Sequence, residues 1–424
     1  MWQFQTDDDF QQELDWIAAF VRERVTPLDH VLGSQWNIHD PGFKKLVRPL
    51  QAIVKVRRLW ACHLGSELGG QGYGQVKLAL MAEQFGRSRF GPIVFGAQAP
   101  DTGNSEILSH YGTPGQKSRY LKPLLENDIV SCFSMTEPQG GADPLVVKMS
   151  ARAEGEHWVL DGEKWFASNA RYAAFYIVVA MTDPEAPPHR RFSMFIVPAE
   201  TPGIEILRDY TIFGEAAPTH AHVRWSGVRV PKENMLGGRG DAFVVAQVRL
   251  GGGRMHHAMR ALAEATQCFE MMCERVVSRV TKGESLSLKQ MVQEKISDSW
   301  TQLRQFRLLI LETAWLADQG KDWKALRKNV AAVKAEMPKV LHDLASRALH
   351  LHGSLGVTTE MPFAHLLLTS YHLGLADGPT EVHKITVARE VLKDVKPAGG
   401  MFPDYIGYAA AERARKLYGP HLED

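Results

Sequence analysis

The spacing of hydrophobic residues changes twice along the chain. Residues 10–128 carry apolar side chains at helical spacing, as at Leu14 and Ile17, and so predict several packed helices. Residues 129–236 switch to short alternating or wholly apolar runs separated by Asp-Gly, Pro-Pro and Thr-Pro-Gly turns, a pattern typical of a compact β domain of sandwich or barrel type. From residue 241 helical spacing returns in long segments that suit a helical bundle.

These changes predict a mainly α protein with a central β domain. We place an N-terminal helical domain at 1–128, a middle β domain at 129–238, a C-terminal helical bundle at 239–395 and a tail at 396–424. The strands expected in the middle domain are 157–160, 175–180, 192–197, 204–207 and 221–225. The long helices expected after it are 241–269 and beyond, 289–316, 324–350 and 380–393.

Turn and cap residues refine three points. Thr113 and Gln116 enclose Pro-Gly and form a capping box with proline at the first helical position, so a helix begins there. Asp161-Gly162 is a tight-hairpin signal. The glycine-rich run 69–74 does not fit the GxGxxG pattern and has no strand before it, so we interpret it as a loop before a helix.

Composition excludes several classes of protein. The 424 residues are 45% hydrophobic, and 49 basic against 48 acidic residues leave a net charge of +1, which gives no reason to expect a nucleic-acid partner. The four cysteines form no CxxC pair and indicate a reducing compartment. The first residues resemble neither a secretion signal nor a transit peptide, and no apolar run is long enough to span a membrane, so we expect a cytoplasmic protein.

Two neighbouring stretches suggest a site for a flat, hydrogen-bonding ring. The first, 131–144, opens as an apolar strand and breaks at Thr136 into Glu-Pro and Gly-Gly, which frees backbone donors and a hydroxyl where the strand ends. The second, 162–169, places Ser168 two residues after the aromatic Phe166, on the same strand face. From the residues alone, a plain strand end and a core aromatic are the favoured explanation of these stretches.

The two stretches resemble the paired flavin-binding signatures of the acyl-CoA dehydrogenase family. The order of helices, β domain and helices is also that family's architecture, and the resemblance covers all but the C-terminal tail. It implies an FAD cofactor, with the first stretch along the isoalloxazine and the second supplying an aromatic ring and a hydroxyl. The FAD contacts that the resemblance implies here are Phe133, Met135, Thr136, Phe166 and Ser168.

A base is expected in the run Leu-Ala-Asp-Gly-Pro-Thr-Glu-Val-His at 375–383. The residues alone favour a turn into a helix with Thr380 as its cap. By resemblance, Asp377 falls where the family places its catalytic glutamate, and a subgroup uses aspartate there within Ala-Asp-Gly-Pro. A carboxylate in a dry pocket makes an adequate base because desolvation raises its pKa. The resemblance further implies that Gly378 contacts substrate and that Thr380 and Glu381 contact FAD.

Two further runs belong to this picture. In 249–257, glycines that we expect before a helix would let a bulky ligand approach, and by resemblance Arg254 faces the substrate, although a solvated arginine at a cap explains the run equally well. His256 and His257 are adjacent and lack a third ligand, so we predict no metal. Residues 99–104, Ala-Pro-Asp-Thr-Gly-Asn, resemble a run of the same subgroup, whose vertebrate members are fused to a kinase-like domain.

A last group resembles elements that reach the FAD of a neighbouring subunit. It implies at least a dimer, and the family is commonly a dimer of dimers. Lys282 replaces a phenylalanine of the family pattern and His350 a glutamine, so the adenine end of the site can differ here. The residues in this group are Arg279, Thr281, Gln290, His350 and Gly353.

We therefore expect an FAD-dependent acyl-CoA dehydrogenase of fatty acid β-oxidation. Asp377 would remove the α-proton of an acyl-CoA, the β-hydride would pass to flavin, and an electron-transfer flavoprotein would collect the electrons to leave a 2-enoyl-CoA. A flavin oxidase of a small carbon acid, as in the related nitroalkane oxidases, and a redox-silent acyl-CoA-binding or flavin-binding protein are the alternatives. The acyl chain length is not predicted.

Overall fold

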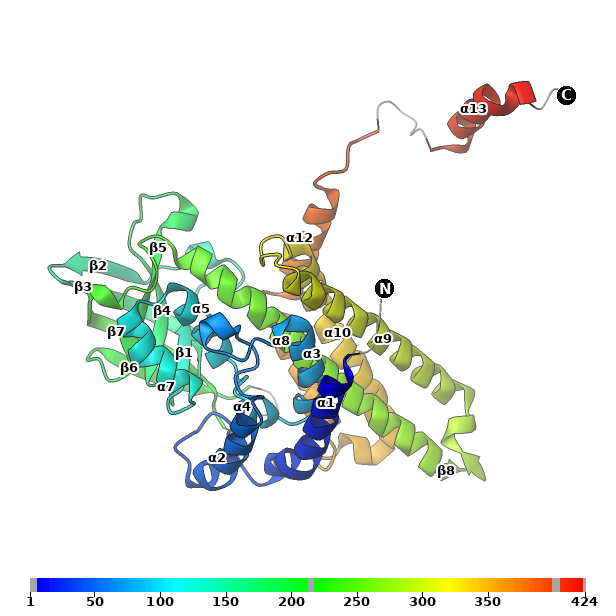
Figure 1. Cartoon of the computed structure of the whole chain (residues 1–424), viewed down its shortest axis with the longest axis horizontal. Coiled ribbons are helices and arrows are strands. Elements are labelled where there is room, and N and C mark those ends of the chain that lie inside the picture. The colour runs from blue at the N-terminus through cyan, green and yellow to red at the C-terminus, as the bar shows by residue number, and fades with distance from the viewer. Residues whose placement is uncertain (1–5, 213–216, 399–404, 422–424) are drawn as a thin grey trace.

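The computed structural model describes residues 6–212, 217–398 and 405–421. Residues 1–5 of the predicted N-terminal domain, 213–216 of the middle domain, and 399–404 and 422–424 of the tail lie outside them. Helices come first, strands follow and helices return, which confirms the predicted architecture (Figure 1). The last helix, α13 (Gly407–Tyr418), stands apart from the rest in Figure 1.

The N-terminal helices form where polar caps precede apolar stripes. In α1, Asp7 caps the helix by accepting from the Phe10 backbone N–H, and the buried side chains include Leu14 and Ile17. The capping box of Thr113 is confirmed, since its hydroxyl accepts from the Gln116 N–H. The helices are α1 (Asp8–Phe20), α2 (Pro41–Val56), α3 (Gly74–Phe85), α4 (Gly91–Val94), α5 (Asp101–Tyr111), α6 (Pro114–Gln116) and α7 (Lys122–Leu125). The loop expected at 69–74 does precede a helix, α3.

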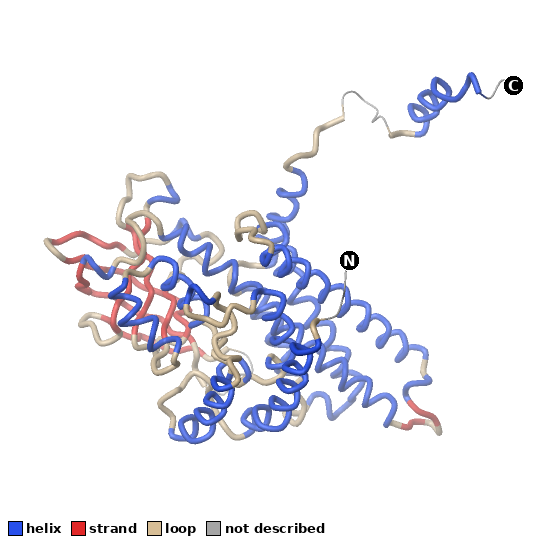
Figure 2. Tube along the Cα trace, in the orientation of Figure 1, coloured by secondary structure: helices blue, strands red, loops and turns tan. Residues whose placement is uncertain are grey.

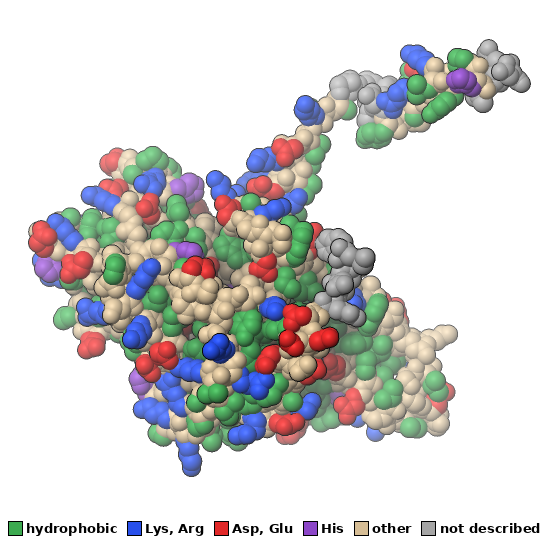
Figure 3. All heavy atoms as spheres, viewed as in Figure 1, with side chains coloured by type: hydrophobic (Ala, Val, Ile, Leu, Met, Phe, Trp, Pro, Cys, Tyr) green, Lys and Arg blue, Asp and Glu red, His purple; other side chains and the backbone are tan. Residues whose placement is uncertain are grey.

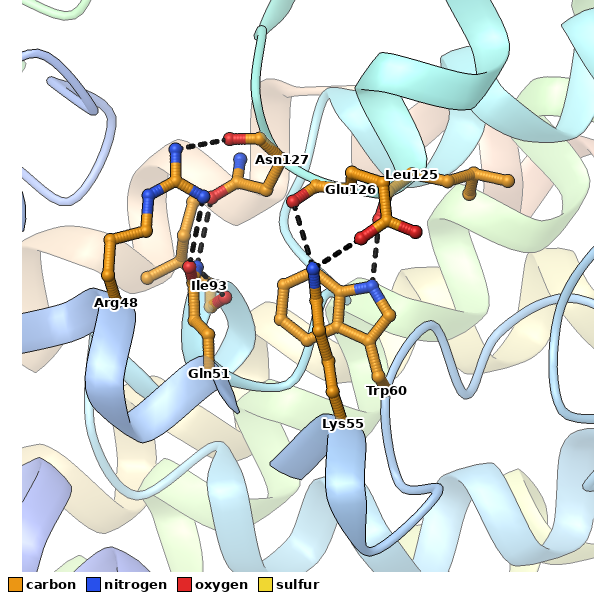
Figure 4. A network of polar contacts seen from close by, with 8 residues as sticks. All are labelled: Arg48, Gln51, Lys55, Trp60, Ile93, Leu125, Glu126 and Asn127. Carbon is orange, nitrogen blue, oxygen red and sulfur yellow. Dashed lines mark hydrogen bonds and ion pairs between the residues drawn. The ribbon is translucent and has the colours of Figure 1, made fainter. Parts of the chain in front are cut away.

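A polar network ties α2 to the end of α7, immediately before the sheet begins (Figure 4). The final carbonyls of a helix have no partner within it, and here side chains of α2 and of the turn that follows α2 donate to them. Gln51 Nε2 also donates to Asn127 Oδ1 at 2.9 Å. The donations to carbonyl oxygens are Trp60 Nε1 to Leu125 (2.7 Å), Lys55 Nζ to Glu126 (3.2 Å) and Arg48 Nη2 to Asn127 (2.6 Å).

The middle of the chain forms one seven-stranded sheet. Its strand order is β1-β4-β2-β3-β7-β6, and β5 pairs with β4 outside this path. Strand β1 runs parallel to β4, with Ser131 opposite Phe175. The strands are β1 (Ser131–Ser134), β2 (Ser150–Glu154), β3 (His157–Ser168), β4 (Phe175–Met181), β5 (Phe192–Pro198), β6 (Ile204–Tyr210) and β7 (His220–Pro231). All five predicted strands are confirmed.

The hairpin predicted at Asp161-Gly162 is wrong. Both residues lie inside β3, and the connection from β2 to β3 falls at Gly155, whose φ is 56°. Gly162 serves a different purpose, because a Cβ on it would come within 2.8 Å of the Met149 Cα. A glycine within a strand can mark such a close approach of backbones rather than a turn.

The two faces of the sheet are buried in different ways. One face closes a core of the β domain's own residues, including Leu160, Val223 and Trp225. The other packs against helices, where Ile177 and Ile196 join Ile107 of α5 and Val245 of α8 in one cluster. Helix α8 therefore joins the sheet to the helical bundle, as its long course in Figure 2 shows.

The C-terminal bundle contains the predicted long helices and one that the sequence analysis missed, α11. A short hairpin, β8 (Val280–Thr281) and β9 (Glu284–Ser285), lies between α8 and α9. The helices are α8 (Ala242–Ser278), α9 (Gln290–Asp318), α10 (Arg327–His352), α11 (Phe363–Leu375) and α12 (Thr380–Leu392).

The glycines of 249–257 lie within α8, not before it as we expected. Each admits a neighbouring group. A Cβ on Gly251 would lie 2.6 Å from the Trp323 ring, and one on Gly252 would lie 2.8 Å from Glu106 Oε2. Glycine has a low helix propensity, but at these positions it allows neighbouring side chains to pack closely against α8.

The face of the molecule shown in Figure 3 mixes acidic and basic side chains, in keeping with the net charge of +1. Within the described part of the chain, no helix combines the length and the apolar character needed to cross a membrane.

Candidate functional site

Asp377 lies in the short connection between α11 and α12, in a left-handed backbone conformation. Its φ is +55°, and Gly378 follows with a φ of +101°. Such a conformation costs a non-glycine residue on the order of 1–3 kcal/mol and persists where the surroundings impose it. Two side chains approach the Asp377 carbonyl oxygen here: Arg254 Nε donates to it at 3.0 Å, and His383 Nε2 lies at 3.3 Å.

The cap expected at Thr380 is wrong. Helix α12 begins at Thr380 with Pro379 as the preceding residue, and no side chain caps it. The Thr380 hydroxyl instead donates to the Gly374 carbonyl oxygen at 3.2 Å, which ties the start of α12 back to α11. The turn therefore does not exist to cap a helix, and the strained Asp377 needs another explanation.

The Asp377 carboxyl group lines a small cavity of about 20 Å³, room for roughly one water molecule. Its side chain is 22% exposed, and its Oδ2 lies 3.5 Å from His257 Nε2. Gly253 of α8 leaves room for it, since a Cβ there would lie 3.8 Å from Oδ2. The cavity is lined by Ala99, Pro100, Thr102, Gly103, Arg249, Gly253, His256, His257, Arg260 and Asp377.

Basic neighbours control the charge of Asp377. Burial by itself raises the pKa of this carboxyl, but His257, Arg249, Arg254 and Lys334 together lower it below its ordinary value. Our expectation of a pKa raised by desolvation is therefore wrong. The cations Arg249, Arg254 and Lys334, together with the His257 ring that faces the carboxyl, outweigh burial, so the carboxyl is ionised at neutral pH and holds the charge that a base requires.

His257 presents a neutral N–H to this carboxylate. Arg260 Nη2 lies 3.1 Å from His257 Nδ1, and arginine can only donate, so Nδ1 is the acceptor and the proton sits on Nε2. Burial and the Arg260 charge lower the pKa of His257 to about 3, which agrees with a neutral ring. The Nε2–H then faces Asp377 Oδ2 across 3.5 Å.

The two stretches that resemble flavin signatures lie side by side. The backbone N–H of Trp165 donates to the Thr136 carbonyl oxygen at 2.8 Å. Beside it Phe166 has a φ of +50° and is 45% exposed as a residue, and Ser168 Oγ lies 2.8 Å from His220 Nδ1. An exposed aromatic ring on strained backbone, next to two hydroxyls, fits a planar ring system that stacks and accepts hydrogen bonds. Phe133, Met135 and Thr136 are partly exposed on the same edge.

Two contacts connect this edge with Asp377. The Arg249 guanidinium lies 3.9 Å from the centroid of the Phe133 ring and also lines the Asp377 cavity. The ring of His220, the neighbour of Ser168, lies 6.0 Å from the ring of His372 on α11. The predicted flavin edge and the predicted base are far apart in sequence, but these contacts place them next to each other.

The group predicted to reach a neighbouring subunit does not join this region. Arg279 and Thr281 are exposed at the β8–β9 hairpin, and Figure 1 places β8 at the end of α8 remote from the sheet. Gln290 at the start of α9, and His350 and Gly353 at the end of α10, are exposed as well. Glu381 is exposed on the first turn of α12, and Gly378 lies beside Asp377.

The structure gives the run 99–104 a role that the sequence analysis did not find. Asp101 Oδ1 accepts from the Ser131 N–H at 2.8 Å, and Asn104 Oδ1 accepts from Arg249 Nε at 2.9 Å. The run thus joins the start of β1 to α8 and forms one wall of the cavity. Burial raises the pKa of Asp101 to about 7. The sequence signal for this role was the set of polar residues at the start of α5, which the structure shows to be buried.

Comparisons with known proteins agree with this arrangement. Three family models match in succession: the acyl-CoA dehydrogenase N-terminal domain at 7–128, middle domain at 132–228 and C-terminal domain at 240–392. The Mycobacterium tuberculosis protein named "Probable acyl-CoA dehydrogenase FadE2" is 36% identical over 93% of this chain and 94% of its own length. The solved butyryl-CoA dehydrogenase of Megasphaera elsdenii is 25% identical with a TM-score of 0.79, covering 92% of this chain and 100% of that one.

Longer relatives match only in part. Acyl-CoA dehydrogenase family member 11 of Rattus norvegicus is 35% identical over 91% of this chain, and this chain spans 50% of that protein. The chain thus spans about half the length of this relative. Taken with the three domain matches, the similarity shows that the chain belongs to the acyl-CoA dehydrogenase family, whose members are flavoprotein oxidoreductases.

Proposed function

We propose that the protein dehydrogenates an acyl-CoA thioester to the 2-enoyl-CoA with FAD as cofactor. The observation that carries this proposal is Asp377, an ionised carboxylate on strained backbone that faces a cavity shared with Arg249, which in turn lies against Phe133. A base beside the predicted flavin edge is what α,β-dehydrogenation requires.

Asp377 takes the α-proton in this proposal. Its Oδ2 has His257 as a neighbour at 3.5 Å, which leaves the carboxylate able to accept a proton. Arg254 acts through the backbone, because its Nε holds the Asp377 carbonyl oxygen and so keeps the carboxylate in place. Entry of a thioester would displace water from the cavity and strengthen the charge interactions within it.

The FAD contacts that we propose are Phe133, Met135 and Thr136 from the end of β1, and Phe166 and Ser168 from β3. FAD, when bound, supplies the acceptor for the β-hydride. The role of the chain is to present a stacking surface at Phe166 and hydroxyls at Thr136 and Ser168. Thr380, Glu381 and Gly378 remain proposed contacts to FAD and substrate at the start of α12.

Several wider features are also proposals. We infer that five exposed residues serve the FAD of a neighbouring subunit in a dimer of dimers. They lie at the β8–β9 hairpin, which is remote from the sheet of their own chain, and at the ends of α9 and α10. These residues are Arg279, Thr281, Gln290, His350 and Gly353. We also propose electron-transfer flavoprotein as electron acceptor, a role in fatty acid β-oxidation, a cytoplasmic location, membership of the Ala-Asp-Gly-Pro subgroup and the domain boundaries given above.

The test is the visible spectrum of the purified, FAD-replete protein under anaerobic conditions, before and after acyl-CoA thioesters are added. We expect at least one thioester to bleach the bound flavin. A yellow protein that consumes oxygen with a small carbon acid and that no thioester bleaches would point to an oxidase. A protein that retains no FAD after reconstitution would contradict the proposal.

A further inference from the structure

A row of side chains crosses three strands at the second stretch of the predicted flavin edge. His220 of β7 stands opposite Ser168 of β3 on one side and opposite Tyr210 of β6 on the other. Residues that pair directly across antiparallel strands project from the same face of the sheet, so the three side chains are neighbours. His220 is therefore the central residue of this row, next to the serine that we propose as an FAD contact.

His220 contacts both candidate FAD residues of that stretch. Its Nδ1 lies 2.8 Å from Ser168 Oγ, within hydrogen-bonding distance, and its ring lies 5.6 Å from the ring of Phe166. The pairing of β3 with β7 shifts register between Lys164 and Ala167, as at a β-bulge, and Phe166 falls within the shift. Bulges often turn a side chain toward a functional site, and this one leaves Phe166 exposed beside Ser168.

The His220 ring is neutral and fixes the direction of the serine hydroxyl. Burial and the nearby His372 lower the pKa of His220 to about 4, so the ring carries no charge at neutral pH. A neutral imidazole nitrogen either donates or accepts, and a hydroxyl offers one donor and two acceptor positions. The contact with Nδ1 therefore occupies one position of the Ser168 hydroxyl and leaves the others for a ligand.

The surroundings of His220 restrict where its imidazole can point. The residue is 8% exposed, and its ring also lies 6.0 Å from the ring of His372 on α11. It is thus held between the sheet and the helical bundle, whereas the Ser168 side of the contact is only half-buried. A rigid, buried group that holds a more accessible hydroxyl is the arrangement that a preorganised binding site requires.

We infer that His220 is a positioning residue of the FAD site, which orients the Ser168 hydroxyl toward the cofactor through its Nδ1. The inference rests on the FAD contacts of the proposed function. A serine side chain without a partner samples several rotamers, and one that is already oriented loses less conformational entropy when a ligand binds. The gain appears as tighter binding of FAD, which can be measured without any substrate.

The experiment measures the dissociation constant of FAD for the apoprotein of the full chain by equilibrium dialysis. His220→Phe should weaken FAD binding about tenfold, because the hydrogen bond that orients the hydroxyl is lost. His220→Asn should regain most of the affinity, since asparagine carries a hydrogen-bonding atom at the position of Nδ1. His157→Phe, the same change at the other end of the β3–β7 pair, should leave FAD binding unchanged.

A double-variant cycle separates positioning of the serine from support of the fold. If His220 acts through the Ser168 hydroxyl, His220→Phe should have no further effect on FAD binding once Ser168→Ala is present. A structural role would instead weaken binding by the same factor in both backgrounds. The cycle is also run with His220→Leu, whose smaller side chain avoids crowding in the buried position, and melting temperatures show whether each apoprotein remains folded.

The outcomes distinguish this inference from the proposed function. An FAD affinity unchanged in His220→Phe, or equal losses with and without the Ser168 hydroxyl, would overturn the role of His220 and leave the dehydrogenase proposal intact. Coupled losses in a protein whose flavin no acyl-CoA bleaches would support the role of His220 and overturn the dehydrogenase proposal. A wild-type apoprotein that binds no FAD would overturn both.

Discussion

Two carboxylates in this protein, Glu137 and Asp377, have lowered pKa values for different reasons. Burial raises the pKa of Glu137, but Lys164 and two backbone N–H groups lower it by more, so the pKa lies below its ordinary value. Its oxygens accept from Lys164 Nζ at 2.8 Å, Lys148 N at 2.7 Å and Met149 N at 3.0 Å. The Asp377 pKa is lowered mainly by surrounding charge, and among the described residues its carboxylate accepts no hydrogen bond and has His257 Nε2 as its ion-pair neighbour at 3.5 Å.

The difference between the two carboxylates indicates a structural role for Glu137 and a chemical role for Asp377. Glu137 and Lys164 are 3% and 0% exposed, and Lys164 also donates to the Met135 carbonyl oxygen, so the pair fixes the end of β1 where the flavin stretch begins. A carboxylate with every oxygen occupied cannot accept a proton without losing those bonds. Asp377 has free acceptor positions in a cavity, as a base requires.

Asp377→Asn should have the largest effect. It removes the proposed base but no short side-chain hydrogen bond, so flavin bleaching by a thioester should slow about 10³-fold while the melting temperature stays close to that of the wild type. Stopped-flow spectroscopy and thermal unfolding check both. Unchanged bleaching would contradict a catalytic Asp377 and would favour a redox-silent binding protein.

Glu137→Gln should show the opposite pattern. It removes the carboxylate that favours the charged form of Lys164, whose pKa burial lowers to about 8, and leaves that buried amine without its ion-pair partner. Breaking a buried ion pair in this way costs about 3–5 kcal/mol of unfolding free energy. Urea unfolding measures the loss, and the double change Glu137→Gln with Lys164→Met should recover part of it. A single variant as stable as the wild type would mean that the ion pair does not hold β1 in place.

His257→Phe sharpens the comparison with the smallest effect. It removes the N–H that faces Asp377, so we expect bleaching to slow about tenfold, and His257→Gln to restore part of the rate. Because His257 lowers the pKa of Asp377, its loss should raise that pKa, and the acidic limb of the rate profile should move to higher pH. The other charged or titratable neighbours of Asp377 are Arg249, Arg254, Arg260, Lys334, His372 and His383.

An unmoved acidic limb in His257→Phe would show that the arginines and Lys334 alone control the charge of Asp377. The measurement is the pH dependence of the bleaching rate at low thioester concentration. His157→Phe again provides the matched control, because it lies on β3 of the sheet.

The sequence predicted elements well where a local pattern decides them. The strand 175–180 is wholly apolar and lies inside β4, and Thr113 caps its helix as its spacing with Gln116 required. Glycine was less informative. Gly162 lies within β3 and Gly251 within α8, and neither forms a turn. Each instead leaves room for a residue of another segment, Met149 beside Gly162 and Trp323 beside Gly251. Local turn rules do not contain that information.

The sequence by itself determined the order of helices and strands, the family resemblance and the candidate residues Asp377, Thr136 and Ser168. These follow from periodicity and from motifs that are continuous along the chain. Only the tertiary structure decided that Arg249, Arg254 and Lys334, together with the His257 ring, lower the pKa of Asp377 and that Arg249 connects it with Phe133. Charge and cavity shape depend on distances between elements that are far apart in sequence, and those distances come from packing.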